Sequence, residues 1–162
     1  MGMMNVFNTR QLQVYAGLCL WQFCIHSEIK HPLIDQLILH LMKIITASDL
    51  PRWEQDGASL DITGRGDPLP EEVSSLITTD NLQVFNALVE NCVEVGIVDM
   101  YGVSTDQPAK FLQRAMDILA SSNVPLPSPT ILSKYKTGED AWGEPVSDIE
   151  LEEIFDAYGV SL

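Results

Sequence analysis

Three histidines, a cysteine and two carboxylates crowd into one short stretch, CIHSEIKHPLIDQLILH, which spans residues 24–40. Imidazoles, thiolates and carboxylates are the side chains that bind transition metals, and a histidine near a glutamate can also move protons. The candidate metal ligands are His26, Glu28 and His31, with His40 further along the chain. Their spacing indicates whether this stretch is a metal or catalytic site or only the turn between two packed helices.

The spacing of the histidines does not match a metal pair on one helix. Two ligands on one helix face lie three or four residues apart, whereas His26 and His31 are five apart. Pro32 favours a helix start, because proline fits the first helical position and disfavours helix in the preceding residue. We therefore interpret HSEIKHP as the turn between two helices, with His31 as an N-cap. The alternative hypothesis is a metal-dependent or acid–base enzyme with its site within residues 26–40.

No other catalytic motif stands out. The chain contains no GxSxG nucleophile elbow and no GxGxxG or GxxxxGK(S/T) nucleotide loop. The acidic stretch TGEDAWGEPVSDIE (137–150) lacks the alternating ligands and central glycine of an EF-hand. GRGD at 64–67 resembles integrin-binding ligands, but we interpret it as an ordinary turn. We predict no cofactor and no catalytic residue, so a non-enzymatic role is the leading hypothesis.

Charge is distributed unevenly along the chain. The net charge is −14, from 23 acidic and 9 basic residues. Residues 1–60 carry a net −1, residues 61–136 a net −5, and residues 137–162 hold eight acids and no base. Phosphate backbones require clustered lysine and arginine, so we predict no nucleic-acid binding. A negative field attracts basic proteins and speeds their encounter, so we expect a basic protein partner.

The acidic C-terminal segment (137–162) contains the predicted partner-binding residues. Trp142 lies among carboxylates, just before a helix with an acidic face. Aromatic anchors contribute contact energy at interfaces, and rim acids steer a cationic partner. The candidate residues are Trp142, Glu139, Asp140, Glu144, Glu150 and Glu153. The alternative is that Trp142 packs onto the helices while the acids are merely solvated.

These features favour a non-enzymatic protein-binding module that acts through an acidic surface. One concrete form is an inhibitor or immunity-type protein that neutralises a basic toxin or enzyme, its negative charge mimicking or blocking an anionic substrate. A further hypothesis is a homodimer in which the apolar first helix is shared between chains.

Composition and cysteine use indicate the compartment. Hydrophobic residues make up 46% of the chain and charged residues 20%, which is typical of a globular protein. Cys19, Cys24 and Cys92 lie in apolar runs and are interpreted as reduced, buried thiols, which favours the cytoplasm. The apolar run 12–25 is too short to span a bilayer and no cleavage site follows it. We therefore expect neither a membrane span nor a secretion signal.

Apolar periodicity predicts an all-α, single-domain bundle (residues 1–162) of about six or seven helices. Capping boxes at 8–11 (NTRQ) and 147–150 (SDIE) mark the starts of the first and last helices. The first helix is apolar nearly all round and pairs with the second in a central N-terminal hairpin. The predicted parts are the core hairpin (7–47), a loop (61–70), a Pro-rich extended segment (123–135) and the acidic C-terminal segment (137–162).

Overall fold

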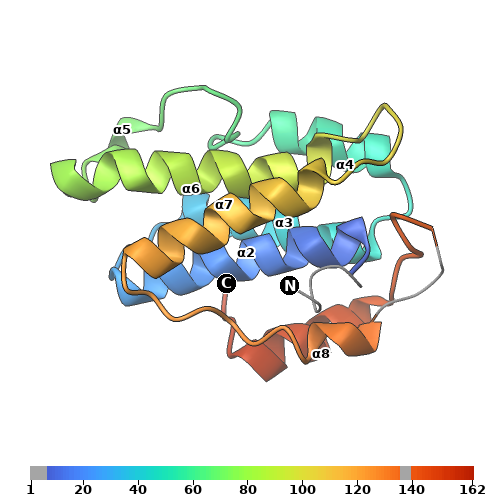
Figure 1. Cartoon of the computed structure of the whole chain (residues 1–162). Coiled ribbons are helices and arrows are strands. Elements are labelled where there is room, and N and C mark those ends of the chain that lie inside the picture. Colours follow the sequence, from blue (N-terminus) through green and yellow to red (C-terminus); the bar gives the residue numbers. More distant parts are fainter. Residues whose placement is uncertain (1–6, 136–139) are drawn as a thin grey trace.

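Helix α2 (Thr9–His26) runs through the middle of the molecule, and the other helices pack around it (Figure 1). The computed structural model describes residues 7–135 and 140–162, and within these ranges it contains helices and connecting segments but no strand. The predicted all-α, single-domain bundle is confirmed. The further elements are α3 (Pro32–Met42), η1 (Lys43–Thr46), α4 (Leu50–Ala58), α5 (Glu71–Ser74), α6 (Thr79–Ile97), α7 (Gln107–Ser121), η2 (Leu132–Tyr135) and α8 (Asp148–Tyr158), where η denotes a 3-10 helix.

Burial of α2 follows from its apolar sequence. Every residue from 7 to 20 is buried, and the helix contacts α3, α6 and α7. The predicted capping box is present: Asn8 accepts a hydrogen bond from the Gln11 amide, and the Gln11 side chain accepts one from the Asn8 amide. Most of the apolar surface of α2 is thus covered within a single chain, whereas Ile25 near its end is exposed. The homodimer that shares this helix stays a prediction.

The turn between α2 and α3 has the predicted form. Glu28 adopts a positive φ of 57°, and His31 is the N-cap of α3, its Nδ1 accepting a hydrogen bond from the Leu33 amide at 3.1 Å. Helix α3 buries its apolar stripe and continues directly into η1. The predicted core hairpin is therefore present, and its last turn is a 3-10 helix.

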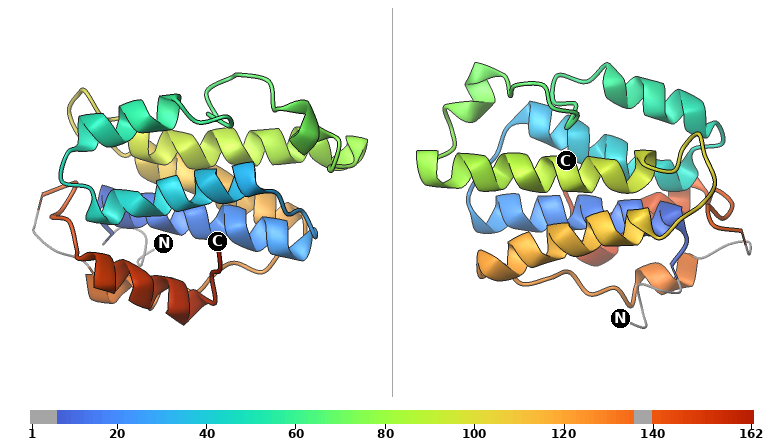
Figure 2. Two further views of the ribbon diagram at one scale, coloured as in Figure 1. Left: turned by 180° about the vertical axis from the view of Figure 1, so that it is seen from behind. Right: turned by 45° about the horizontal axis from the view of Figure 1, so that its top comes forward.

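Helices α6 and α7 run in opposite directions and pack side by side against α2 (Figure 2). Gln13 of α2 is fully buried at this interface and donates a hydrogen bond to the Cys92 carbonyl of α6 at 2.8 Å. Helix α8 lies on the other side of α2 from α6 (Figure 1). The bundle therefore has α8 on one outer side and α4, α5 and α6 on the other.

The Pro-rich segment that leads from α7 towards α8 is extended over a shorter range than predicted. Residues 124–130 are non-helical, and the hydroxyls of Tyr15 and Tyr158 hold this stretch by donating to main-chain carbonyls. The predicted range of 123–135 was wrong at its C-terminal end, where Leu132–Tyr135 forms η2. Leu132, the first residue of η2, is fully buried, so this tight turn brings its apolar side chain into the core.

Candidate functional site

A groove of about 350 Å³ is lined by Leu39 of α3, by the C-terminal half of α8 and by residues 160–162 after that helix, and we call it the α3–α8 groove. Its apolar part comes from Leu39 and Phe155, both partly buried, from Val160, which is buried, and from Leu162, which is exposed. Glu152 and Asp156 line it from α8 and are exposed. Ser161 also lines it. An apolar floor edged by two carboxylates suits a ligand that combines positive charge with an apolar group.

Helix α8 fixes the relative positions of the two carboxylates. Glu152 and Asp156 are four residues apart and therefore lie on the same helix face, about 6 Å apart along the axis. The capping box of Ser147 and Glu150 starts the helix, and Gly159 ends it with a left-handed φ of 68°. Because local interactions fix both ends of α8, they also fix which residues of the helix belong to its acidic face.

The electrostatic character of the groove is negative. No lysine or arginine occurs in residues 137–162, and no ion pair within the described residues involves Glu152 or Asp156. Asp156 also lies in the last turn of α8, where the helix dipole contributes further negative potential. Four bases elsewhere already pair with acids: Lys30, Arg52, Arg65 and Lys110.

Arg10 joins the segment that precedes α8 to the helical hairpin. Its side chain is buried and donates to the carbonyls of Ile44 at 2.5 Å, Ala47 at 2.7 Å and Gly143 at 3.4 Å. Burial lowers the pKa of the guanidinium, and the nearby Glu144 carboxylate opposes this effect. Two backbone hydrogen bonds connect the same parts of the chain, Thr9 N to Ala141 O at 2.7 Å and Val146 N to Ile45 O at 2.8 Å. Arg10 thereby helps to hold α8 beside η1, the continuation of α3.

The sequence-predicted partner-binding residues that the structure describes lie in the loop before α8 and in the first half of that helix, and none of them lines the α3–α8 groove. Trp142 is partly buried and packs against the hydrophobic core. Asp140 accepts hydrogen bonds from the amides of Trp142 and Gly143, at 2.9 and 2.6 Å. Asp140 therefore shapes the turn, and Trp142 occupies the packed position that the sequence left open as an alternative.

Two further predicted acids also have partners within the chain. Glu150 completes the capping box with Ser147. Glu153 accepts a hydrogen bond from the Tyr135 hydroxyl at 3.0 Å. Glu139 lies outside the described residues. The structure thus gives Glu150 and Glu153 local roles and brings a different pair of acids to the groove.

None of the groove residues, which include Leu39, Glu152 and Asp156, was among the partner-binding residues selected from the sequence. The four-residue spacing of the two acids was a usable signal, because it places both on one helix face. Leu39 offered a second signal, since it is an apolar residue outside the fully buried stripe of α3. The sequence could not predict that α8 packs beside η1, at the end of α3, which brings these residues to one groove.

The candidate metal ligands lie at different positions of the turn between α2 and α3. His26 ends α2 and is exposed, whereas His31 caps α3 and lies 3.9 Å from the Glu72 carboxylate. Glu28 is exposed in the turn between them. Across residues 7–135 and 140–162, no group of three or more His, Cys, Asp or Glu side chains is arranged to hold a metal ion.

His40 lies in a different environment, against α4. Its ring stacks on Trp53 with centroids 4.7 Å apart, and Trp53 Nε1 donates to the His40 carbonyl at 2.8 Å. Burial lowers the pKa of His40 to about 4, with Asp56 opposing this effect, so the ring is neutral near neutral pH. A second, shallower cavity of about 270 Å³ is lined by His40, Lys43, Thr46, Ala47, Ser48, Asp49, Arg52, Trp53 and Asp56.

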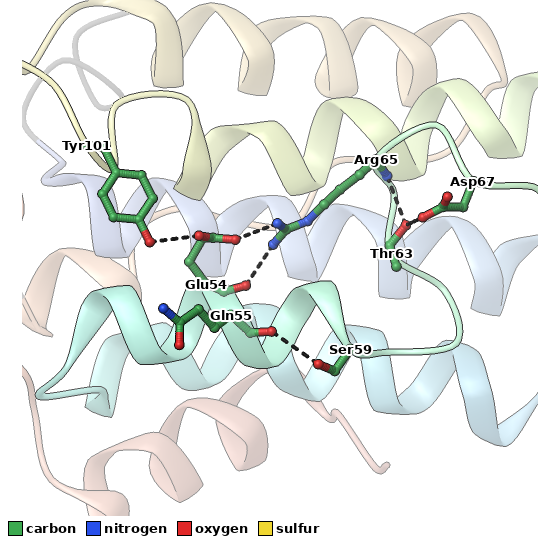
Figure 3. Close-up of polar contacts among 7 residues, drawn as sticks. All are labelled: Glu54, Gln55, Ser59, Thr63, Arg65, Asp67 and Tyr101. Atoms are coloured by element: carbon green, nitrogen blue, oxygen red, sulfur yellow. Dashed lines mark hydrogen bonds and ion pairs between the residues drawn. The ribbon is translucent and has the colours of Figure 1, made fainter.

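Both charged residues of the GRGD stretch are engaged within the chain (Figure 3). Arg65 donates to the carboxylate of Glu54 at 2.5 Å and to its main-chain carbonyl at 2.9 Å. The Tyr101 hydroxyl donates to the same carboxylate at 2.8 Å. Asp67 accepts a hydrogen bond from the Thr63 hydroxyl at 2.7 Å. The hydrogen bond from Arg65 lowers the pKa of Glu54, as expected for a structural pair.

Comparison with protein-family models, curated proteins and solved structures found no match to this chain. In the part of the chain that the structure describes, no helix has the length and apolar character needed to cross a membrane. The basis for a functional proposal is therefore the geometry and charge of the chain's own residues.

Proposed function

We propose that the protein is a non-enzymatic binding protein whose α3–α8 groove receives a cationic segment of a protein partner. The observation that carries the proposal is the combination of an apolar floor, from Leu39 and Phe155, with the exposed carboxylates of Glu152 and Asp156. Apolar contact in such a groove contributes affinity, and the acids at its edge orient a basic partner and speed its approach.

An inhibitor or immunity-type protein directed at a basic toxin or enzyme is one form of this function. In such a complex, carboxylates of α8 would take positions that belong to an anionic substrate of the partner. The net charge of −14 supports fast encounter with a cationic protein. The three cysteines are buried and free, which supports a reducing compartment such as the cytoplasm.

A peptide-display selection against the immobilised full chain tests this proposal. We expect the enriched peptides to carry net positive charge and to lose binding to the variant with Glu152→Gln and Asp156→Asn. The matched control carries Asp61→Asn and Glu90→Gln, which remove the same charge from exposed positions after α4 and on α6. Enrichment of neutral or acidic peptides, or equal loss of binding in both variants, would contradict a cation-binding groove.

A further inference from the structure

Resting on the proposed function, the geometry of the groove defines its ligand more closely. We infer that the bound segment is an amphipathic α-helix, with two basic side chains one turn apart and an apolar side chain on the same face.

The spacing of Glu152 and Asp156 determines the spacing of the basic residues that we expect in the partner segment. Glu152, Phe155 and Asp156 are at positions i, i+3 and i+4 of α8, so an aromatic ring lies on the same face as two carboxylates. A partner helix with lysine or arginine at i and i+4 repeats the same rise of about 6 Å. Both ion pairs can then form together, while an apolar residue beside them contacts Phe155 and Leu39.

The walls of the groove favour a helix over an extended peptide. Basic residues at i and i+2 of an extended chain are also about 6.6 Å apart, so the spacing of charges alone does not distinguish the two conformations. Bound strands gain affinity by pairing with an exposed sheet edge, and residues 7–135 and 140–162 contain no strand. The groove is lined by α8, by Leu39 of α3 and by the non-helical residues 160–162. A helix satisfies its own backbone and packs its side-chain ridges between α3 and α8.

The volume of the groove limits what it can bind. At about 350 Å³ it is near the lower end of the range of about 300–1,000 Å³ for ligand pockets. It is therefore suited to apolar side chains presented by a larger partner. A small polyamine would pair with Glu152 and Asp156 but would leave the apolar floor of Leu39 and Phe155 without a matching group.

Two synthetic peptides of about 15 residues, a length at which isolated helices become populated, test the inference. Both have the same composition; one places two lysines at i and i+4 with a leucine on that face, and the other places the lysines at i and i+2. Fluorescence anisotropy gives the affinities, and circular dichroism gives the helix content on mixing. We expect the first peptide to bind about tenfold more tightly and to gain helix, because its isomer forms one ion pair fewer and misplaces the leucine.

The variants separate this inference from the proposed function. Glu152→Gln with Asp156→Asn should reduce the affinity of the first peptide about tenfold, and Asp61→Asn with Glu90→Gln should leave it within about twofold. If the isomer binds the groove equally well without helix gain, or if spermine displaces the helical peptide at equal concentration, the inference is wrong and a cation-binding groove remains. If neither peptide binds, or if the groove variant binds both unchanged, the proposed function is wrong as well.

Discussion

Arg10 shows how one residue can hold distant parts of this chain together. Its guanidinium satisfies the carbonyls of Ile44 and Ala47 at the end of η1 and reaches Gly143 in the loop before α8. Arginine presents several donors in a fixed plane, which lysine cannot reproduce. We therefore expect Arg10→Met to lower the free energy of unfolding by about 3 kcal/mol and Arg10→Lys by about half of that.

Urea unfolding of the two variants measures this effect. The control is Arg114→Met, because Arg114 lies at the surface over the Phe111 ring, and its loss should change stability by less than about 1 kcal/mol. An Arg10→Met variant as stable as Arg114→Met would show that the buried hydrogen bonds do not hold the C-terminal segment in place.

His40 makes stability depend on pH. Burial lowers its pKa from 6.5 to about 4, so between these values the unfolded chain takes up the proton more readily than the folded protein. The contribution of the neutral ring is therefore fully present above pH 6.5 and is lost as pH falls towards about 4. The groups that act on its charge are Asp56, which favours the protonated form, and Arg65 and Lys43, which oppose it.

Urea unfolding of the wild type and His40→Gln across this pH range isolates the effect. We expect the wild type to lose more stability than the variant as pH falls through the window from 6.5 to about 4. Carboxylates that titrate near the lower end affect both proteins, so the difference between them reports His40. Parallel pH profiles would mean that the ring is as easily protonated in the folded protein as in the unfolded chain.

At the scale of elements, the packing of α6 against α2 depends on the absence of a side chain at Gly96. A Cβ there would lie 2.4 Å from Gln13 Oε1 and 2.9 Å from Trp53 Cη2, and both of these side chains are buried. We expect Gly96→Ala to destabilise the protein by about 1–3 kcal/mol through overpacking. The matched control is Gly102→Ala, where nothing lies within 4 Å of the added Cβ. Equal stability of the two variants in thermal unfolding would contradict this close contact.

The elements could be predicted from the sequence wherever their determinants are local. The capping boxes at Asn8 and Ser147 and the proline at position 32 each mark a helix start that the structure shows. Helix α2 was predicted to be central because its sequence is apolar on every side, and it is buried throughout its first three turns. The turn of η2 was missed because it depends on burying Leu132, which is a long-range contact.

The candidate site was predicted only in part, for the same reason. Charge counting identified the acidic C-terminal segment as the region of interest, and the α3–α8 groove uses acids from it. Sequence proximity to Trp142 selected other acids as candidates, and the Trp142 ring packs partly against the hydrophobic core. One apolar residue of the groove, Leu39, lies more than a hundred positions away from its acids in the chain.

At the scale of the whole molecule, the net charge of −14 has two opposite consequences for salt dependence. Like charges repel within the folded protein, and salt screens this repulsion, with a Debye length of about 10 Å at about 0.1 M. We therefore expect the melting temperature to rise as sodium chloride is added to a salt-free buffer, while binding of a cationic peptide weakens. Calorimetry and fluorescence anisotropy over the same salt series measure both, and a falling melting temperature would show that ion pairs outweigh repulsion.

The most direct test of the central claim is to locate a bound cationic peptide on the folded protein. Backbone amide chemical shifts of the isotopically labelled full chain, recorded during titration with the helical lysine peptide, report the site. We predict the largest changes at Leu39 and along residues 152–161, where α3 and α8 form the groove. Changes centred instead on the loop around Trp142, or on α6 and α7, would contradict the α3–α8 groove as the binding site.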